Sequence, residues 1–83
     1  MNPRVKAVRA NPDFTLTLLF TNGETRRFDV KPYLDKGTFR QLKEPGAFKL
    51  VKPFLGSIQW KGGQDFCPDT LYEGSDPTEE CIG

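Results

Sequence analysis

The chain contains no histidine among its 83 residues. Imidazole is the side chain that ordinarily changes charge near neutral pH, so its absence excludes histidine acid–base catalysis and histidine metal ligation. The chain also lacks the G-x-G-x-x-G and Walker A patterns, and Gly62-Gly63 is too short to cradle phosphate groups. We therefore predict a protein that is not an enzyme and that holds no cofactor and no metal ion.

Long apolar runs are missing as well. No run approaches the ~20 residues of a membrane-spanning helix, and residues 1–9 have no apolar segment typical of a secretory signal. The two cysteines, Cys67 and Cys81, have no zinc-site spacing. We expect a cytoplasmic protein with no membrane partner and two reduced thiols, and a Cys67–Cys81 disulfide is the alternative.

The charges are sorted along the chain, although the net charge is only +1. Residues 1–61 hold all 12 basic and five acidic residues, a net charge of +7, whereas residues 62–83 hold six acidic residues and no basic one. A basic face could contact phosphates, and its candidate residues on the expected strands are Lys6, Arg9, Arg26 and Arg27. The alternative is an acidic tail that lies over a basic body or keeps it soluble.

Alternation of residue types predicts a β-hairpin in the first half of the chain. From Phe14 to Phe20, apolar residues at every second position fall on one face, and Thr15 and Thr17 fall on the outer face. Asn22-Gly23 supplies two residues that tolerate positive φ, which favours a type I′ turn before a strand over residues 24–30. Another strand is expected over residues 5–10.

The second half predicts a short helix and short strands. Thr38 and Gln41 have the spacing of a capping box, and Pro45-Gly46 is expected to end that helix. Proline suits the first helical position, so Pro68-Asp69 is expected to begin a final helical turn. Short strands are expected over residues 48–53, 57–60 and 64–66.

These elements predict an α+β domain over residues 1–73, with an antiparallel sheet of four to six short strands, one short helix and a final helical turn. Residues 74–83 are polar and acidic, and we expect them to form a flexible tail. The expected core consists of Leu16, Leu18, Phe20, Phe28, Leu42, Phe48, Ile58, Trp60, Phe66 and Leu71.

The run from Trp60 to Tyr72 is the most specific pattern in the chain. Its form, W-x-G-G-x-D-x-x-P-D-x-L-Y, follows an N-G hairpin and an F-x-x-L helix, and this order resembles a family of small bacterial proteins called domain of unknown function 2442. The resemblance covers about residues 4–73. The residues that carry it are Phe39, Leu42, Phe48, Trp60, Gly62, Gly63, Asp65, Pro68, Asp69, Leu71 and Tyr72.

The resemblance implies a small α+β domain with an antiparallel sheet and no established activity. Some members resemble the front half of proteins that end in a helix-turn-helix domain, and some are encoded beside toxin–antitoxin-like partners. Some carry a molybdopterin-guanine dinucleotide biosynthesis label. Nucleotidyl transfer of that kind needs a nucleotide-binding loop, which this chain lacks.

Three residues of this run are the candidates for chemistry. Asp65 and Asp69 could hold a cation or act as an acid–base pair, and Cys67 could be reactive at the start of a helical turn. The structural alternative is that Asp65 bonds backbone amides beside Gly62-Gly63, Asp69 starts the turn and Cys67 is a buried or capping thiol.

The favoured function is a non-enzymatic protein-interaction or regulatory module, antitoxin-like in its use of an acidic tail or an exposed sheet edge. One alternative is a nucleic-acid-associated regulator that acts through its basic strand face. The other is an enzyme or accessory factor that uses Asp65, Cys67 and Asp69.

Overall fold

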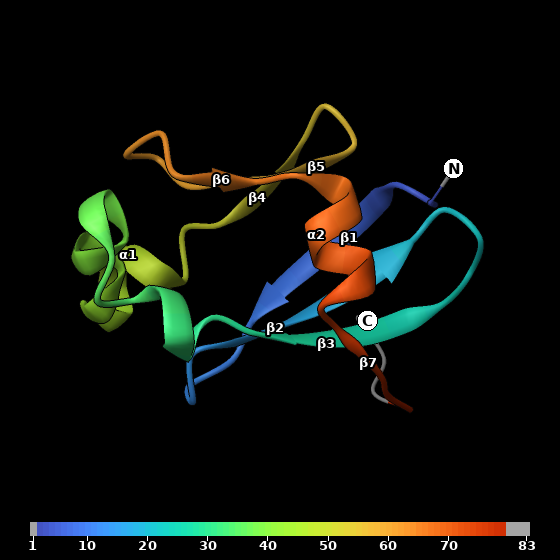
Figure 1. Ribbon diagram of the computed structural model, residues 1–83, viewed down its shortest axis with the longest axis horizontal. Coiled ribbons are helices and arrows are strands. Elements are labelled where there is room, and N and C mark those ends of the chain that lie inside the picture. The colour runs from blue at the N-terminus through green and yellow to red at the C-terminus, as the bar shows by residue number, and fades with distance from the viewer. Residues whose placement is uncertain (1, 80–83) are drawn as a thin grey trace.

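Two antiparallel sheets face each other in the computed structural model, which describes residues 2–79 (Figure 1). The larger sheet has the order β1-β2-β3-β7 and the smaller sheet has the order β4-β5-β6. The larger sheet consists of β1 (Val5–Ala10), β2 (Thr15–Phe20), β3 (Thr25–Asp29) and β7 (Asp76–Pro77). The smaller sheet consists of β4 (Lys52–Phe54), β5 (Ser57–Gln59) and β6 (Asp65–Phe66). The α+β class is confirmed, but the expected single sheet is divided in two.

The β2–β3 hairpin is confirmed, although its turn differs from the expected type I′. Gly23 N–H donates to the Phe20 carbonyl (3.0 Å), and Phe20 N–H donates to the Glu24 carbonyl (2.9 Å), so the loop has three residues. Gly23 has a φ of +88°, whereas Asn22 is not in the positive-φ region. This is a type I turn followed by a left-handed glycine. Trp60 and Gln64 close the same kind of loop around Gly63, which has a φ of +93°.

The segment between the sheets is helical in a different way from the expected helix. It comprises η1 (Lys31–Tyr33), η2 (Gly37–Lys43) and α1 (Pro45–Phe48), where η marks a 3-10 helix. The predicted capping box is wrong, because Lys36 is the N-cap of η2 and no side chain caps it. The helix η2 ends at Lys43, before Pro45 as expected, and Pro45 also begins α1, because its fixed φ suits a first helical position. The strand expected from Phe48 therefore starts later, at Lys52.

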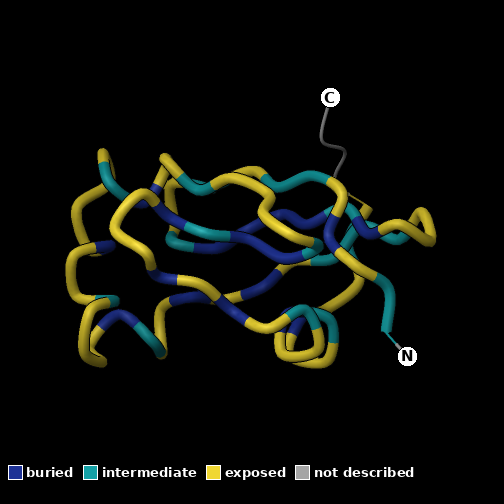
Figure 2. Tube along the Cα trace, turned by 90° about the horizontal axis from the view of Figure 1, so that it is seen from above, coloured by how far each residue is buried: buried dark blue, intermediate teal, exposed yellow. Residues whose placement is uncertain are grey.

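The core lies between the two sheets, where Figure 2 shows the buried positions running through the middle of the molecule. All ten residues predicted for the core are buried, and Val5, Val30 and Leu34 join them. Phe66 is central to an aromatic cluster. Its ring centroid lies 5.1 Å from Phe28, 5.0 Å from Tyr33 and 6.0 Å from Trp60. Edge-to-face pairs of this kind stabilise a core beyond the area they bury.

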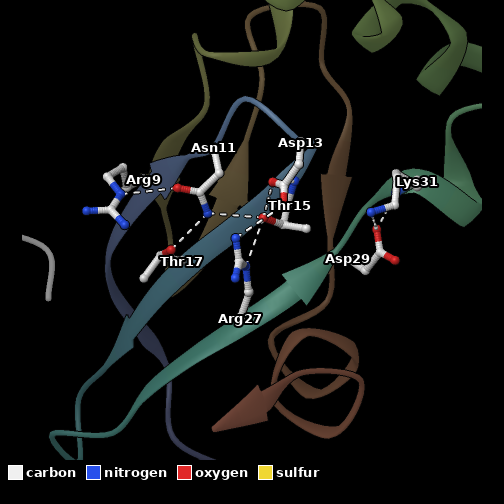
Figure 3. A network of polar contacts seen from close by, with 8 residues as sticks. All are labelled: Arg9, Asn11, Asp13, Thr15, Thr17, Arg27, Asp29 and Lys31. Atoms are coloured by element: carbon white, nitrogen blue, oxygen red, sulfur yellow. Dashed lines mark hydrogen bonds and ion pairs between the residues drawn. The ribbon is translucent and has the colours of Figure 1, made fainter. Parts of the chain in front are cut away.

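The outer face of the larger sheet is more closed than the alternation predicted. Thr15 and Thr17 are buried, with exposed fractions of 6% and 0%. The amide of Asn11 donates to both threonine hydroxyls, at 3.1 and 2.9 Å, and covers them (Figure 3). These threonines are buried because the longer side chain of Asn11 lies over their short hydroxyls.

The final helical turn is confirmed as α2 (Pro68–Glu73), with Pro68 in its first turn. Ser75, Asp76 and Pro77 belong to the stretch that was expected to be a flexible tail. In the structure Arg27 pairs with Asp76 and Arg26 pairs with Pro77 across β3 and β7. The thiol of Cys81, the second half of the alternative disulfide, lies outside the described residues. Within residues 2–79, no helix has the length and apolar character needed to cross a membrane.

Candidate functional site

The residues of the Trp60–Tyr72 motif separate into a structural group and a surface group. Trp60 and Leu71 are buried core residues, with exposed fractions of 1% and 0%. Gly63 needs its positive φ for the turn, and a methyl group on Gly62 would lie 2.7 Å from Gln64 Oε1. These residues therefore specify the fold. Asp65, Cys67 and Asp69 are exposed and form the surface group.

The surface group is not gathered in one hollow. Asp65 and Cys67 line a hollow of about 270 Å³ together with Phe54 and Leu55. Asp69 lines a different hollow with Asn2, whose side-chain amide donates to Asp69 Oδ1 at 3.3 Å. In the part of the chain that the structure describes, no group of three His, Cys, Asp or Glu residues is placed to hold a metal ion.

The register of the smaller sheet gives Asp65 its neighbours. Lys52 pairs with Gln59, and Gln59 pairs with Asp65. Residues directly opposite one another share a face, so these three side chains form one row across the three strands. Ile58 and Phe66 alternate with them and are buried, so the row lies on the side away from the core. We call this side the outer face of the smaller sheet, and it also carries the exposed Phe54 and Cys67, while Ser57 between them is buried.

The hairpin that joins β4 to β5 presents apolar side chains to solvent. Phe54 is 45% exposed and Leu55 is 81% exposed. Leu55 has a φ of +49° and Gly56 a φ of +81°, so both central residues of this two-residue turn have positive φ. Asn or Gly ordinarily occupies the first of these positions, and a left-handed leucine costs about 1–2 kcal/mol. Two non-glycine residues described have a positive φ, Leu55 and the half-buried Phe14, and Leu55 is the most exposed large apolar residue described.

Neighbouring residues hold this hairpin in place. Val5 N–H donates to the Gly56 carbonyl at 2.9 Å, which ties the turn to the start of β1. The side chain of Arg4 lies close over Gly56, so that a methyl group there would be 2.7 Å from Arg4 Cδ. The strands expected over residues 48–53 and 57–60 place a connection here but do not predict its exposure. The feature that could have indicated this site is Leu55 itself, because a leucine precedes glycine in a two-residue turn where asparagine is favoured.

The edge of β4 is poorly suited to strand addition. Pro53 occupies the middle of this three-residue strand and has no N–H to donate. Proline on an edge strand is a common device against pairing with another strand. Contact with another molecule is therefore favoured across the outer face instead of along this edge.

The four basic residues proposed for phosphate contact do not form one patch. Arg26 lies on the core side, opposite Leu18, while Arg27 pairs with Thr17 on the outer side of the larger sheet. Arg9 also pairs with Thr17, so Arg9 and Arg27 flank it (Figure 3). Lys6 is exposed at a β-bulge in β1.

The guanidinium groups of Arg26 and Arg27 both bind other groups of the same chain. Arg26 donates to Ser75 Oγ at 2.8 Å and to the Ser75 carbonyl at 2.5 Å, and it lies 4.7 Å from the Tyr72 ring centroid. Arg27 forms a 3.2 Å ion pair with Asp13. The pKa of Asp13 is lowered, first by the hydrogen bond from the Thr15 hydroxyl and then by the charge of Arg27.

A second polar contact fastens α2 to the β2–β3 hairpin. The Tyr72 hydroxyl donates to Glu24 Oε1 at 2.7 Å. This bond lowers the pKa of Glu24, with further help from Asn22 and Arg26, and it raises the pKa of Tyr72. The bond and the Arg26–Tyr72 contact together hold α2 and the C-terminal strand on the larger sheet.

Comparison with known proteins gives one family. The model of the family described as Protein of unknown function (DUF2442) matches residues 5–77. This range begins with the first residue of β1 and ends with the last residue of β7. No curated protein and no solved structure gives a significant match.

Proposed function

The chain belongs to the DUF2442 family of proteins of unknown function, and we propose that it is a non-enzymatic protein-interaction or regulatory module that binds its partner through the outer face of the smaller sheet. The observation that carries this proposal is Leu55, which is 81% exposed in a left-handed conformation. A strained backbone at an exposed apolar residue is typical of a site that contacts another molecule.

The composition of the surface supports a protein partner. Phe54 and Leu55 supply apolar area at one end of the face, and Leu50, which is 51% exposed, supplies it at the other. Lys52, Gln59 and Asp65 lie between them and can form polar contacts. An apolar anchor beside a polar rim is the usual anatomy of a protein–protein contact.

The non-enzymatic part of the proposal is supported by the chemistry of the candidates. The chain has no histidine, and Asp69 lines a different hollow from Asp65 and Cys67. A nucleophilic cysteine needs a neighbouring base that removes its proton. Turnover of a substrate by the pure protein, abolished by Asp65→Ala with the fold intact, would overturn this part.

A protein partner is favoured over nucleic acid because Arg26 and Arg27 point to opposite sides of the larger sheet and both contact groups of the same chain. We place the module in the cytoplasm, in keeping with the sequence expectation. Salt-sensitive binding to duplex DNA that is lost in Arg27→Ala and Arg9→Ala would instead favour the nucleic-acid alternative.

The test is copurification of partners with a tagged copy from the native cell. Leu55→Asp places a charge on the proposed contact surface, and we expect it to lose the partner recovered with the unaltered chain. Lys36→Asp is the control, because Lys36 is exposed just before η2 and does not belong to the outer face of the smaller sheet. Equal recovery with both variants would contradict the proposal.

A further inference from the structure

The row across the smaller sheet is ordered by charge. Lys52 is positive, Gln59 is neutral and Asp65 is negative, and each lies on a neighbouring strand of the order β4-β5-β6. Within residues 2–79 the structure gives neither Lys52 nor Asp65 an ion-pair partner. Adjacent strands lie about 4.8 Å apart, so the two outer residues of the row are about 10 Å from each other.

Such a row is complementary to itself. Rotation by 180° about an axis that lies along β5 exchanges the positions of β4 and β6 on a facing copy. Lys52 then lies opposite Asp65 of the second copy, Asp65 lies opposite its Lys52, and the two Gln59 amides meet at the axis. A two-fold contact of this kind uses the same patch on both molecules.

We propose that the occupant of the outer face is a second copy of this chain, packed face to face about this axis. The inference rests on the proposed function, because it names the partner of the same surface. Two opposite-charge contacts form per dimer, and complementary charges fix the register of an interface.

The neighbouring row adds apolar contact to the same arrangement. Phe54 pairs with Ser57, and Cys67 follows on the β6 side. The same rotation brings Phe54 of one copy over Cys67 of the other, at the hollow of about 270 Å³ that Phe54, Leu55, Cys67 and Pro68 of each copy line together. Burial of these exposed side chains supplies the attraction that a surface ion pair alone lacks.

The geometry also excludes one competing mode of self-association. Strand-to-strand pairing along β4 would require a donor from Pro53, which has none. A face formed by three short strands is small, so the contact belongs with the weak, transient class below about 1,200 Å². Self-association is therefore expected at high protein concentration.

The experiment is sedimentation equilibrium of the full chain from about 10 µM to about 1 mM. We expect the average mass of the unaltered chain to rise from 9.4 kDa towards twice that value. Lys52→Asp and Asp65→Lys each place two like-charge pairs in the dimer, so each weakens self-association at least about tenfold. Lys36→Asp is the matched control and leaves it unchanged, and circular dichroism checks the fold of every variant.

Mixing the two charge variants is the decisive arm. In an equimolar mixture of Lys52→Asp and Asp65→Lys, every facing pair is again opposite in charge, and association returns. The double variant, which carries both changes in one chain, also returns to the dimer. A mixture and a double variant that remain as weak as the single variants would overturn the two-fold geometry.

Failure of this inference is distinguishable from failure of the proposed function. An unaltered chain that stays monomeric at about 1 mM overturns the second copy as occupant. If Leu55→Asp still loses a copurified protein of a different sequence, the interaction module stands with another partner. If the unaltered chain dimerises and neither Lys52→Asp nor Asp65→Lys weakens self-association, the dimer uses another surface and the inference is wrong.

Discussion

The indole Nε1–H of Trp60 donates a 2.8 Å hydrogen bond to the buried carbonyl oxygen of Phe48. The two rings also pack against each other, with centroids 5.8 Å apart. This contact fixes the end of α1 to the end of β5, and so it joins the helical segment to the smaller sheet. Trp60 is thus an anchor for the fold that supports the outer face.

Replacing Trp60 tests this anchor. Trp60→Phe removes the donor, leaves the Phe48 carbonyl without its partner and opens a small cavity. We expect the free energy of unfolding to fall by about 2–4 kcal/mol. Urea unfolding followed by circular dichroism measures the change, since the variant has no tryptophan fluorescence. A loss below about 1 kcal/mol would contradict the anchoring role.

Two glycines offer a matched pair for the backbone. Gly63 has a φ of +93°, while Gly46 lies in α1 without a positive φ, and a methyl group on either would meet no atom within 4 Å. Gly63→Ala is expected to destabilise the protein by about 1 kcal/mol, and Gly46→Ala to stabilise it by about 0.5–1 kcal/mol. Thermal unfolding of both variants measures the two effects. Equal shifts of the unfolding temperature would show that the turn at Gly63 tolerates a residue with a side chain.

The strain at Leu55 predicts a stabilising substitution. Leu55→Asn creates the preferred first residue for a turn whose central residues both have positive φ, and little burial is lost because Leu55 is 81% exposed. We expect the free energy of unfolding to rise by about 0.5–1 kcal/mol. The same variant should bind a partner less well. A free energy of unfolding that is unchanged or lower in Leu55→Asn would show that the Leu55 side chain stabilises the fold.

The Tyr72–Glu24 bond predicts a dependence on acid. The hydroxyl of Tyr72 lowers the folded-state pKa of Glu24 below its ordinary value of 4.5. The contribution to stability is therefore fully present above pH 4.5 and is lost as pH falls through the lowered pKa. Tyr72→Phe should raise the pKa of Glu24 in an NMR titration and flatten the stability profile below pH 4.5.

Tyr33→Phe is the control for that titration, because Tyr33 stacks on Phe28 in the core cluster. We expect Tyr33→Phe to leave the pKa of Glu24 unchanged. An unchanged Glu24 pKa in Tyr72→Phe would show that Asn22 and Arg26 are sufficient to lower it.

Arg26 and Arg27 are neighbours in sequence with opposite surroundings. The side chain of Arg26 is 15% exposed and holds Ser75, whereas that of Arg27 is 43% exposed. Arg26→Ala should lower the free energy of unfolding by about 1–3 kcal/mol, because it frees the C-terminal strand and leaves buried acceptors unpaired. Arg27→Ala should cost less than about 1 kcal/mol in the same urea measurement. The reverse order would contradict the structural role of Arg26.

Local patterns in the sequence predicted most elements of the fold. Alternation located β2, Asn22-Gly23 placed β3 after it and Pro68-Asp69 located α2, because these signals act within a few residues. The capping box at Thr38 and Gln41 failed because η2 begins at Gly37, which places Thr38 inside the helix. The Gln41 side chain instead accepts a hydrogen bond from Gln64 Nε2 at 3.4 Å, and Gln64 comes from a distant turn.

The candidate site was predictable only in part. The motif drew attention to Asp65 and Cys67, but it also included Trp60 and Leu71, which are core residues. Lys52 and Gln59 carried no signal, because single charged and amide residues are common in any sequence. Their relation to Asp65 follows from the register of three strands, and register is a property of pairing between segments.

The sequence by itself determined the α+β class, the hairpins and the identity of the buried residues, since hydrophobic periodicity decides which side chains leave water. The tertiary structure alone decided what the Trp60–Tyr72 run does. Pairing of β4, β5 and β6 placed Asp65 in a charge-ordered row and set Cys67 beside the exposed Phe54 and Leu55. Strand pairing brings together residues that are far apart in the chain, and no local pattern in the sequence predicts which of them will meet.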